Sequence, residues 1–189
     1  MKKLFLSLLV ALVAFKAVAD SPLVANWTPL FNGTNLNGWV VMNGGKFSVT
    51  NGAIQIENGM GWLRTERAFT NFVLQAEWRG LETNYNSGFF LRAGLAGQPM
   101  PTNGWQANLK QADLGAWLQN KDIKLSPKPT IVPVGEWAVF TLEAHGTNAT
   151  LWLNGTKLWT QGFDATSGFI GIQAEDKRME LRSVRVMEL

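Results

Sequence analysis

The sequence predicts an all-β protein, an antiparallel sandwich or barrel, and three observations support this. Short runs of alternating or apolar residues fill most of the chain, and no window has a helical period of hydrophobicity. Turn signals separate these runs, and many short strands between regular turns are typical of antiparallel sandwiches and barrels. The main turn signal is Asn-Gly, which tolerates the positive φ angles of tight hairpins. It occurs at Asn32, Asn37, Asn43, Asn51, Asn58, Asn103 and Asn154.

The expected strands follow one another from residue 38 to the carboxyl end. One segment, 119–137, breaks this rhythm, because it contains three prolines and no clear strand. We expect it to be a long connection between two sheets, and loops of that length are usually functional or mobile. Since strands resume on both sides, residues 20–189 are predicted to form a single domain. The expected strands are 38–42, 46–50, 53–57, 72–79, 87–93, 104–111, 137–144, 149–155, 168–174 and 179–187.

Residues 1–19 have the pattern of a secretory signal peptide. Two lysines precede an apolar run over 4–15, and Ala-Val-Ala at 17–19 supplies the small residues of a cleavage site. The run is too short for a membrane-spanning helix. The three lysines of this segment account for the whole net charge of +3. The rest of the chain is formally neutral, so its charge does not indicate a nucleic-acid partner or an anionic membrane.

The chain contains no cysteine. The signal pattern predicts an exported protein, periplasmic or secreted. Because it has no cysteine, we expect that it uses no disulfide and is not a lipoprotein anchored through an acylated cysteine. After cleavage of the signal, no membrane association is expected. The oligomeric state is left open by the sequence.

Strand alternation predicts several faces that are rich in long polar side chains. Amides, carboxylates and guanidinium groups can hydrogen-bond sugar hydroxyls, and the nine tryptophans could supply aromatic platforms. A solvated outer sheet with the tryptophans in the core is the alternative. The stretch 104–111 is the clearest case, because Trp105, Ala107 and Leu109 alternate with polar residues. The polar set is Glu77, Arg79, Arg92, Gln106, Asn108, Lys110, Gln173, Glu175, Glu180 and Arg182.

Standard catalytic motifs are scarce. The chain has one histidine and no cysteine, so a His/Cys metal cluster is excluded. The histidine, His145, is predicted to be an exposed residue beside a hairpin turn. Paired carboxylates remain an option for glycoside chemistry. The candidates are Glu77, Glu175, Asp176 and Glu180.

Two of the charged candidates also have purely structural interpretations. Glu180 could form a salt bridge with Arg178 or Arg182 on the same strand face. Arg92 could form a structural ion pair, with Glu77 as one candidate partner.

Six motifs occur in the order found in a known family. They are LFNGTNLNGW at 30–39, FVLQAEWR at 72–79, NSGFFLR at 86–92, GEW at 135–137, LWLNGTKL at 151–158, and GFIGIQ at 168–173 followed by MELRSVRVMEL at 179–189. The chain resembles the 3-keto-disaccharide hydrolase family across nearly all of residues 20–189. The resemblance implies a concanavalin A-like jelly roll, which is an antiparallel β-sandwich.

The resemblance also implies a chemistry and a carbohydrate ligand. In a 3-ketoglycoside, a base can remove the acidic C2 hydrogen, the glycosidic oxygen leaves C1, and water then adds to the enone. The resemblance suggests Glu180 or Glu175 as the base, with Arg92, Lys110 and Arg182 stabilising the negative charge of the enolate. The residues expected to bind substrate are Gln106, Asn108, Lys110, Gln173, Arg182, Glu77, Arg79 and Trp105.

The stretch 104–111 departs from the family pattern, because Gln106 replaces an expected acid. Glu175 stands near a position where the family often has histidine. No cofactor is assigned, although a divalent cation with oxygen ligands is one option. Three functions stay open: a hydrolase of 3-ketoglycosides or disaccharides, a non-catalytic carbohydrate-binding module on the same fold, and a structural interaction domain.

Overall fold

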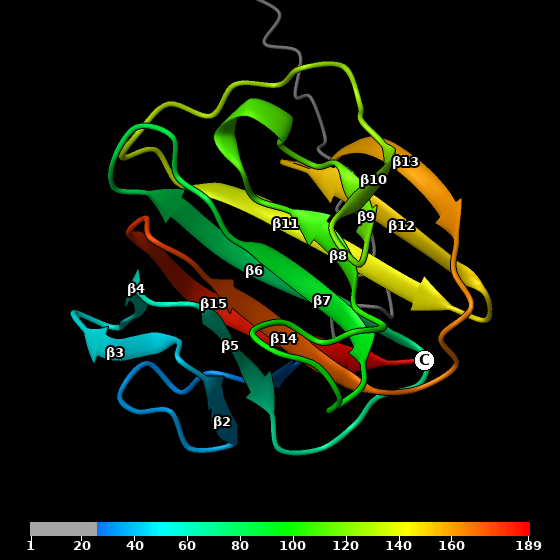
Figure 1. Ribbon diagram of the computed structural model, residues 1–189, viewed down its shortest axis with the longest axis horizontal. Helices are drawn as coiled ribbons and strands as arrows, with labels where there is room; N and C mark the ends of the chain where they lie inside the picture. Colours follow the sequence, from blue (N-terminus) through cyan, green and yellow to red (C-terminus); the bar gives the residue numbers. More distant parts are fainter. Residues whose placement is uncertain (1–25) are drawn as a thin grey trace, which may run out of the picture.

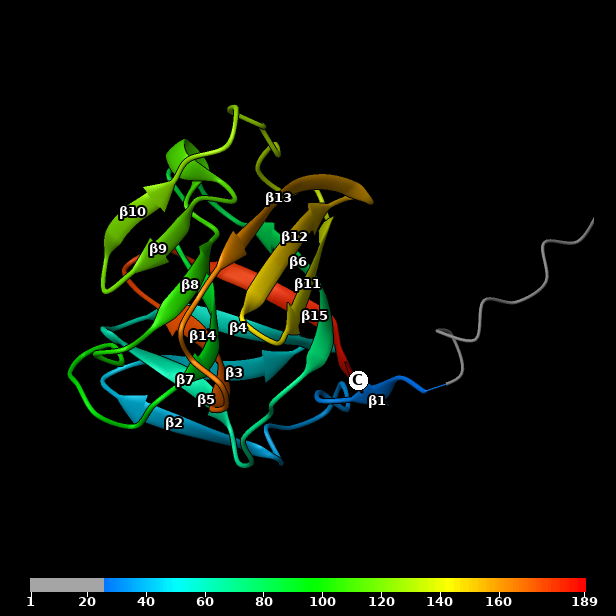
Figure 2. The same cartoon turned by 90° about the vertical axis from the view of Figure 1, so that its right-hand side faces the viewer.

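Two antiparallel sheets pack face to face in the computed structural model, which describes residues 26–189 (Figures 1 and 2). The predicted signal peptide lies outside the described residues. Figure 2 shows strands β8, β9 and β10 on the left side of the molecule and β11, β12 and β15 on the right. The antiparallel sandwich predicted from the turn and strand pattern is therefore confirmed. Within residues 26–189, no helix has the length and apolar character needed to cross a membrane.

The eight-stranded sheet contains the long strands of the molecule. Its order is β13 (Thr156–Gly162), β12 (Asn148–Leu153), β11 (Ala138–His145), β6 (Phe72–Gly80), β15 (Met179–Glu188), β4 (Ala53–Asn58) and β3 (Lys46–Thr50), and β1 (Thr28–Pro29) also pairs with β15.

The seven-stranded sheet is built from shorter strands. Its order is β10 (Asp122–Leu125), β9 (Trp117–Gln119), β8 (Trp105–Asn108), β7 (Gly88–Ala93), β14 (Phe169–Ala174), β5 (Gly61–Thr65) and β2 (Trp39–Asn43). One turn of 3-10 helix, η2 (Gln111–Asp113), follows β8.

The core fills the space between the sheets with the apolar half of each alternating strand. In β6, Leu74 and Trp78 are buried while Gln75 and Glu77 face outward, as the period of two requires. The sheets meet through aromatic rings, and the centroids of Phe89 and Phe140 lie 6.5 Å apart. Burying one such side chain stabilises the fold by about 1.5–3 kcal/mol.

The expected strands are present, but the sequence missed β1, β5, β9, β10 and β13. Residues 119–137 do not lack strand structure, because β9 and β10 form a hairpin there. Its two turn residues, Asn120 and Lys121, have φ angles of 51° and 76°. This hairpin escaped detection because lysine rarely adopts a positive φ. Residues 126–137 do connect the two sheets, and Val132 is buried beneath the Tyr85 hydroxyl, which donates to its carbonyl at 3.1 Å.

Candidate functional site

The outer face of the seven-stranded sheet carries two adjoining cavities of about 360 and 220 Å³. Gln106, Lys121 and Gln173 line both cavities, so together they form one depression, which we call the trough. Strand alternation places its floor, because Ala107 and Ile172 point into the core while Gln106 and Gln173 point outward. The predicted alternation of residues 104–111 is confirmed.

An amide pair lies at the centre of the trough. The Gln106 Nε2 donates to the Gln173 Oε1 at 2.5 Å, and the two residues are 6% and 8% exposed. Gly88 on β7 makes room for this arrangement, because a β-carbon there would lie 2.1 Å from the Gln106 Nε2. Each amide still has unused hydrogen-bonding capacity toward the cavity. The pair can therefore hold sugar hydroxyls, but neither amide can take up a proton.

Glu175 brings a carboxylate to the same face, just after the end of β14. The Asn86 side chain donates to its Oε2 and orients it. Burial raises the pKa of the Glu175 carboxyl above its ordinary value, and the negative charge of Asp176 adds to this rise. Lys121 and Lys110 lower the same pKa, although burial dominates. A half-buried carboxyl of this kind suits a general base.

Two lysines bring ammonium groups to the trough, where Asp113 and Glu175 supply two carboxylates. Lys110 follows β8, and its ammonium lies 3.9 Å from Asp113. Lys121 stands in the β9–β10 hairpin and lines both cavities. Its φ of 76° is unfavourable for a lysine, and such backbone strain is concentrated at functional sites. The two ammonium groups could stabilise negative charge that develops on a bound ligand.

An apolar wall completes the first cavity. Phe90 on β7 and Met100 of the β7–β8 loop line it, and both pack into a small buried cluster with Trp62. The rings of Phe90 and Trp62 meet edge to face at 5.7 Å. The trough thus combines an aromatic wall with polar groups on its floor, as small-molecule sites commonly do.

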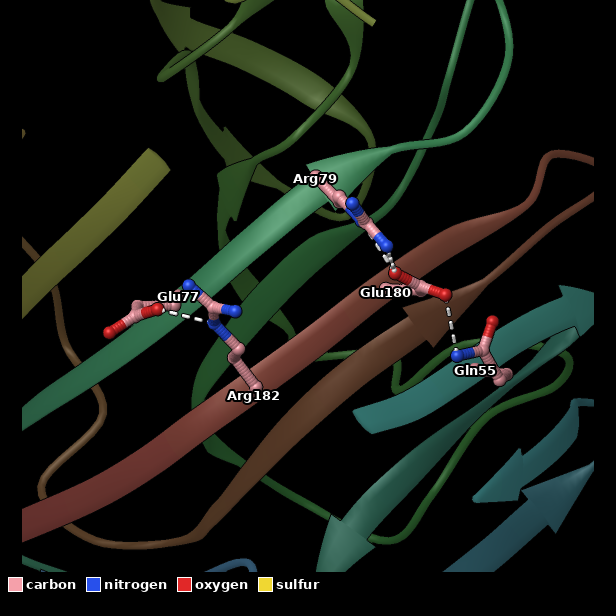
Figure 3. Close-up of polar contacts among 5 residues, drawn as sticks. All are labelled: Gln55, Glu77, Arg79, Glu180 and Arg182. Carbon is pink, nitrogen blue, oxygen red and sulfur yellow. Dashed lines mark hydrogen bonds and ion pairs between the residues drawn. The ribbon is translucent and has the colours of Figure 1, made fainter. Parts of the chain in front are cut away.

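Four of the predicted site residues lie on the other side of the molecule, on the outer face of the eight-stranded sheet (Figure 3). The Glu180 carboxylate accepts from Arg79 at 2.5 Å and from Gln55 at 2.8 Å. Two residues further along the same pair of strands, Arg182 donates to Glu77 at 2.6 Å. The guanidinium groups of Arg79 and Arg182 lie 4.5 and 4.0 Å from the Trp137 ring centroid.

The structure therefore does not bring Glu180, Arg182, Glu77 and Arg79 into the trough. Alternation along one strand indicates which side chains point outward, but a sandwich has two outer faces. The proposed salt bridge of Glu180 exists with a different partner, because antiparallel pairing places Arg79 beside it.

Arg92 lies in neither outer face, which corrects its assignment as a charge stabiliser at the surface. It is 1% exposed, and its guanidinium donates to the carbonyls of Thr70, Gly146 and Ala165 and to the Asn71 side chain. The cause is a β-bulge, since Arg92 has a φ of 49° and adds one residue to β7 relative to β14. The predicted alternation fails at this residue, and no ion pair with Glu77 forms.

Trp105 also departs from its expected role as a substrate platform. It belongs to the core cluster, where its ring stacks on Trp117 at 5.2 Å. Its indole nitrogen donates to Asp164 at 2.7 Å. His145 is exposed at the end of β11, as predicted.

The residues that the sequence missed in the trough include Asn86, Phe90, Met100 and Lys121. Asn86 and Phe90 belong to the motif at 86–92, but neither was predicted to be a site residue. No sequence signal marks Lys121, because its position depends on an Asn-Lys turn that folds as a tight hairpin.

The option of a divalent cation finds no ready site, since residues 26–189 contain no group of three or more His, Cys, Asp or Glu side chains that could hold a metal.

Solved structures share this fold at low identity. A candidate glycosyl hydrolase from Parabacteroides distasonis is 21% identical, with a TM-score of 0.73 over 88% of this chain and 95% of its own. The carbohydrate-binding module CBM66 from Bacillus subtilis is 16% identical, with a TM-score of 0.70 over 80% and 96%. A Bacillus subtilis protein with a galectin-like fold is 12% identical, with a TM-score of 0.61 over 87% and 95%. The predicted jelly roll is confirmed.

No curated protein matches the sequence closely enough to count as a relative. The profile of the 3-keto-alpha-glucoside-1,2-lyase-like domain, in contrast, matches residues 26–187. This match confirms the resemblance drawn from the six motifs and supports a role related to carbohydrates. The chain therefore belongs to the 3-keto-alpha-glucoside-1,2-lyase-like domain family.

Proposed function

We propose that the protein is an exported enzyme that cleaves 3-ketoglycosides by elimination in the trough, with Glu175 as the base. The observation that carries this proposal is the placement of the Glu175 carboxylate. It is half-buried, oriented by Asn86 and flanked by lysines, in the depression that also contains the Gln106–Gln173 pair. Glu180, the other candidate base, is already bound to Arg79 and Gln55 on the opposite face.

The proposed reaction needs one base and one group that stabilises an enolate. Glu175 takes the proton from C2, and the electron pair of that bond moves onto the C3 carbonyl oxygen as an enolate. Lys110 and Lys121 stabilise the negative charge. The enolate then collapses, a C1–C2 double bond forms, and the C1–O bond breaks. The leaving oxygen gains a proton that balances the one removed from C2, and later addition of water to C1 completes a net hydrolysis.

The remaining groups fit a sugar. Gln106 and Gln173 have free amide hydrogen-bonding positions for hydroxyls, and Asn108 adds another on the same strand face. Phe90 is largely buried but contributes an apolar edge to the cavity wall, against which the C–H side of a ring could lie. The two cavities side by side leave room for groups on both sides of a glycosidic bond.

A carbohydrate-binding role without turnover is the second candidate. The specific observation that favours it is the Gln106–Gln173 pair, because two amides occupy the centre of the trough where the family pattern has an acid at position 106. Such a floor can hold a ligand without moving a proton.

Glu175→Gln tests the proposal, with Glu180→Gln as the matched control on the other face. Turnover of a chromogenic 3-ketoglycoside is followed by absorbance, and binding of the same compound by calorimetry. We expect Glu175→Gln to lower kcat by about 10²–10⁴-fold, the typical contribution of a general base, with little change in affinity. Glu180→Gln should keep its turnover.

Two outcomes would count against this assignment. Unchanged turnover in Glu175→Gln would show that Glu175 is not the base. If the wild type binds the compound but never turns it over, the protein is a binding module.

A further inference from the structure

A second polar and aromatic groove lies on the outer face of the eight-stranded sheet, on the opposite side of the sandwich from the trough. Its volume is about 580 Å³, larger than either cavity of the trough. Trp27 and Trp152 line it, together with Gln75, Thr141 and Arg185. We call it the tryptophan groove.

A β-bulge in β15 builds one wall of this groove. Arg182 pairs with Glu77 and Arg185 with Gln75, so β15 has one more residue than β6 across this step. Ser183 supplies the bulge with a φ of 51°. The bulge lets Val184 stay in the core while Arg182 and Arg185 both face outward. Without it, regular alternation would turn Arg185 toward the core.

The bulge aligns a row of polar groups across the sheet. Arg185 donates to the Gln75 Oε1 through Nε at 3.0 Å and through its terminal nitrogen at 2.5 Å. Gln75 in turn donates to the Thr141 hydroxyl at 3.2 Å. Thr141 pairs in register with Trp152, so the row leads directly to an indole ring. These side chains hold one another in place before any ligand arrives.

The second indole is fixed from the other end of the row. The Arg185 guanidinium lies 4.8 Å from the Trp27 ring centroid. Trp27 immediately precedes β1, which pairs with β15 alongside Arg185. Both tryptophans are half-buried, which leaves part of each ring open to the groove. Amphipathic indole rings of this kind suit ligands with one apolar and one hydroxylated side.

The charges of the groove point to a neutral ligand. One cation, Arg185, is matched by one carboxylate in the lining, Glu143. Gln75 and Thr141 contribute neutral hydrogen-bonding groups. Neither an anionic chain nor a basic peptide is favoured by this balance, whereas a polyhydroxylated ring with apolar C–H faces matches indoles and amides together.

We propose that the tryptophan groove is a second carbohydrate-binding site, which holds a neutral oligosaccharide segment apart from the trough. This inference does not require turnover in the trough. Because the two sites lie on opposite outer faces of the sandwich, both can be occupied at once. Trp27 and Trp152 would stack on sugar rings, while Gln75, Thr141 and Arg185 would bind hydroxyls.

The test is calorimetric titration with maltohexaose, cellohexaose and xylohexaose. We expect at least one of them to bind the wild type, and Trp152→Ala to weaken that binding by about tenfold or more, as loss of a central aromatic anchor does. Trp152→Phe should recover part of the affinity, since a ring remains. Gln75→Leu should also weaken binding, and it checks the polar row without removing a tryptophan.

Measurements on the trough separate this proposal from the proposed function. Glu175→Gln should bind the hexasaccharide as the wild type does, and Trp152→Ala should turn over a small chromogenic 3-ketoglycoside as the wild type does. Urea unfolding of each variant checks that the fold is kept. The proposal is overturned if no hexasaccharide binds the wild type, or if folded Trp152→Ala and Gln75→Leu both bind with unchanged affinity.

Discussion

Glu175 and Glu180 show how the surroundings of a residue determine what it can do. Both follow apolar strand residues and both point away from the core. Glu180 meets Arg79 and Gln55 on neighbouring strands, which occupies its two oxygens. Glu175 meets an amide and faces a cavity that two lysines line. Both carboxylates line a cavity, but Glu180 lies on the other face and both of its oxygens already accept hydrogen bonds from protein side chains.

The pH dependence of the protein follows from the raised pKa of Glu175. As a base it must be ionised, so kcat/KM should rise with pH through a midpoint above the ordinary value of 4.5. The effect on stability has the opposite sign. A carboxyl whose pKa is raised on folding stabilises the fold below 4.5, and this contribution is lost as pH rises through the folded pKa.

A pH–rate profile of the wild type measures the first effect, and urea unfolding at acidic and neutral pH measures the second. Glu175→Gln should be more stable than the wild type at neutral pH, because its side chain never ionises. A midpoint below the ordinary carboxyl value would contradict the assignment.

Arg92 is predicted to stabilise the folded protein through its buried guanidinium. Replacing it with methionine leaves the carbonyls of Thr70, Gly146 and Ala165 without this donor. It also removes one of the two hydrogen bonds that the Asn71 Oδ1 accepts. We expect the free energy of unfolding to fall by about 3–5 kcal/mol, as for other broken buried networks. Urea unfolding measures this loss. The control Arg178→Met removes an exposed ion pair and should change stability by no more than about 0.5 kcal/mol.

A different result would return Arg92 to the reaction. If Arg92→Met keeps the stability of the wild type but loses turnover, its guanidinium acts on the substrate through a rearrangement of these loops.

At the scale of elements, bulges and hairpin turns decide where functional side chains point. The bulge at Arg92 turns a predicted surface residue into a buried one, and the bulge at Ser183 brings Arg185 to the tryptophan groove. The Asn120–Lys121 turn folds β10 back on β9 and places an ammonium group at the trough. Each bulge depends on one residue with a positive φ, and the turn depends on two.

Lys121→Gly is expected to separate stability from function. Glycine adopts a positive φ without steric cost, so the variant should gain about 1 kcal/mol of stability. The same change removes an ammonium group from the trough and should lower turnover. Lys121→Met is the matched control, because it loses the charge but keeps the strained backbone, so it should lose turnover without gaining stability. Thermal unfolding and turnover assays check both variants. A stabilised Lys121→Gly with full activity would mean that the lysine has no role in the reaction.

At the scale of the whole molecule, the two outer faces of the sandwich are separate surfaces joined by one core. The trough lies on one face, and the tryptophan groove and the ion pairs of Figure 3 lie on the other. Residues 126–137 cross from one sheet to the other, and Val132 fixes this crossing in the core. Tyr85, buried beside Trp78, holds Val132 by its hydroxyl.

Tyr85→Phe is predicted to loosen this connection between the sheets. Loss of one buried hydrogen bond should lower the free energy of unfolding by about 0.5–1.5 kcal/mol and speed proteolysis within 126–137. The exposed control Ile131→Ala should have a smaller effect on stability. If Tyr85→Phe is cleaved no faster than the wild type, the hydrogen bond does not hold the segment.

The same tyrosine makes stability sensitive to alkaline pH. Burial raises the pKa of Tyr85 from 10.0 to about 12. Because the unfolded chain releases this proton first, the wild type should lose stability as pH rises between these two values. Tyr85→Phe should lack this part of the alkaline loss, which urea unfolding across the alkaline range would reveal.

Much of the fold could be predicted from the sequence, because its signals are local. Alternation in 72–79 and 104–111 placed side chains inside or outside correctly, and the Asn-Gly turns separated most strands. The strands that were missed have weaker local signals. Thr156–Gly162 follows an Asn-Gly turn but carries mostly polar residues, and β9 and β10 meet at a turn that contains no glycine.

The candidate site was predicted only in part. Gln106, Asn108, Lys110, Gln173 and Glu175 do share one face, as expected for a site floor. Glu180, Arg182, Glu77 and Arg79 are equally polar and equally outward, yet they belong to the other sheet.

The amino-acid sequence by itself determined the strand period, most turns and the family, because these depend on neighbours along the chain. Only the tertiary structure decided which polar faces meet. Strand order, which places β8 near β14 and β15 beside β6, arises from pairing between residues far apart in sequence. Two single-residue bulges then shifted the alternation of β7 and β15. The division of one polar set into a trough, a buried arginine and an opposite groove is therefore a property of the packed sheets.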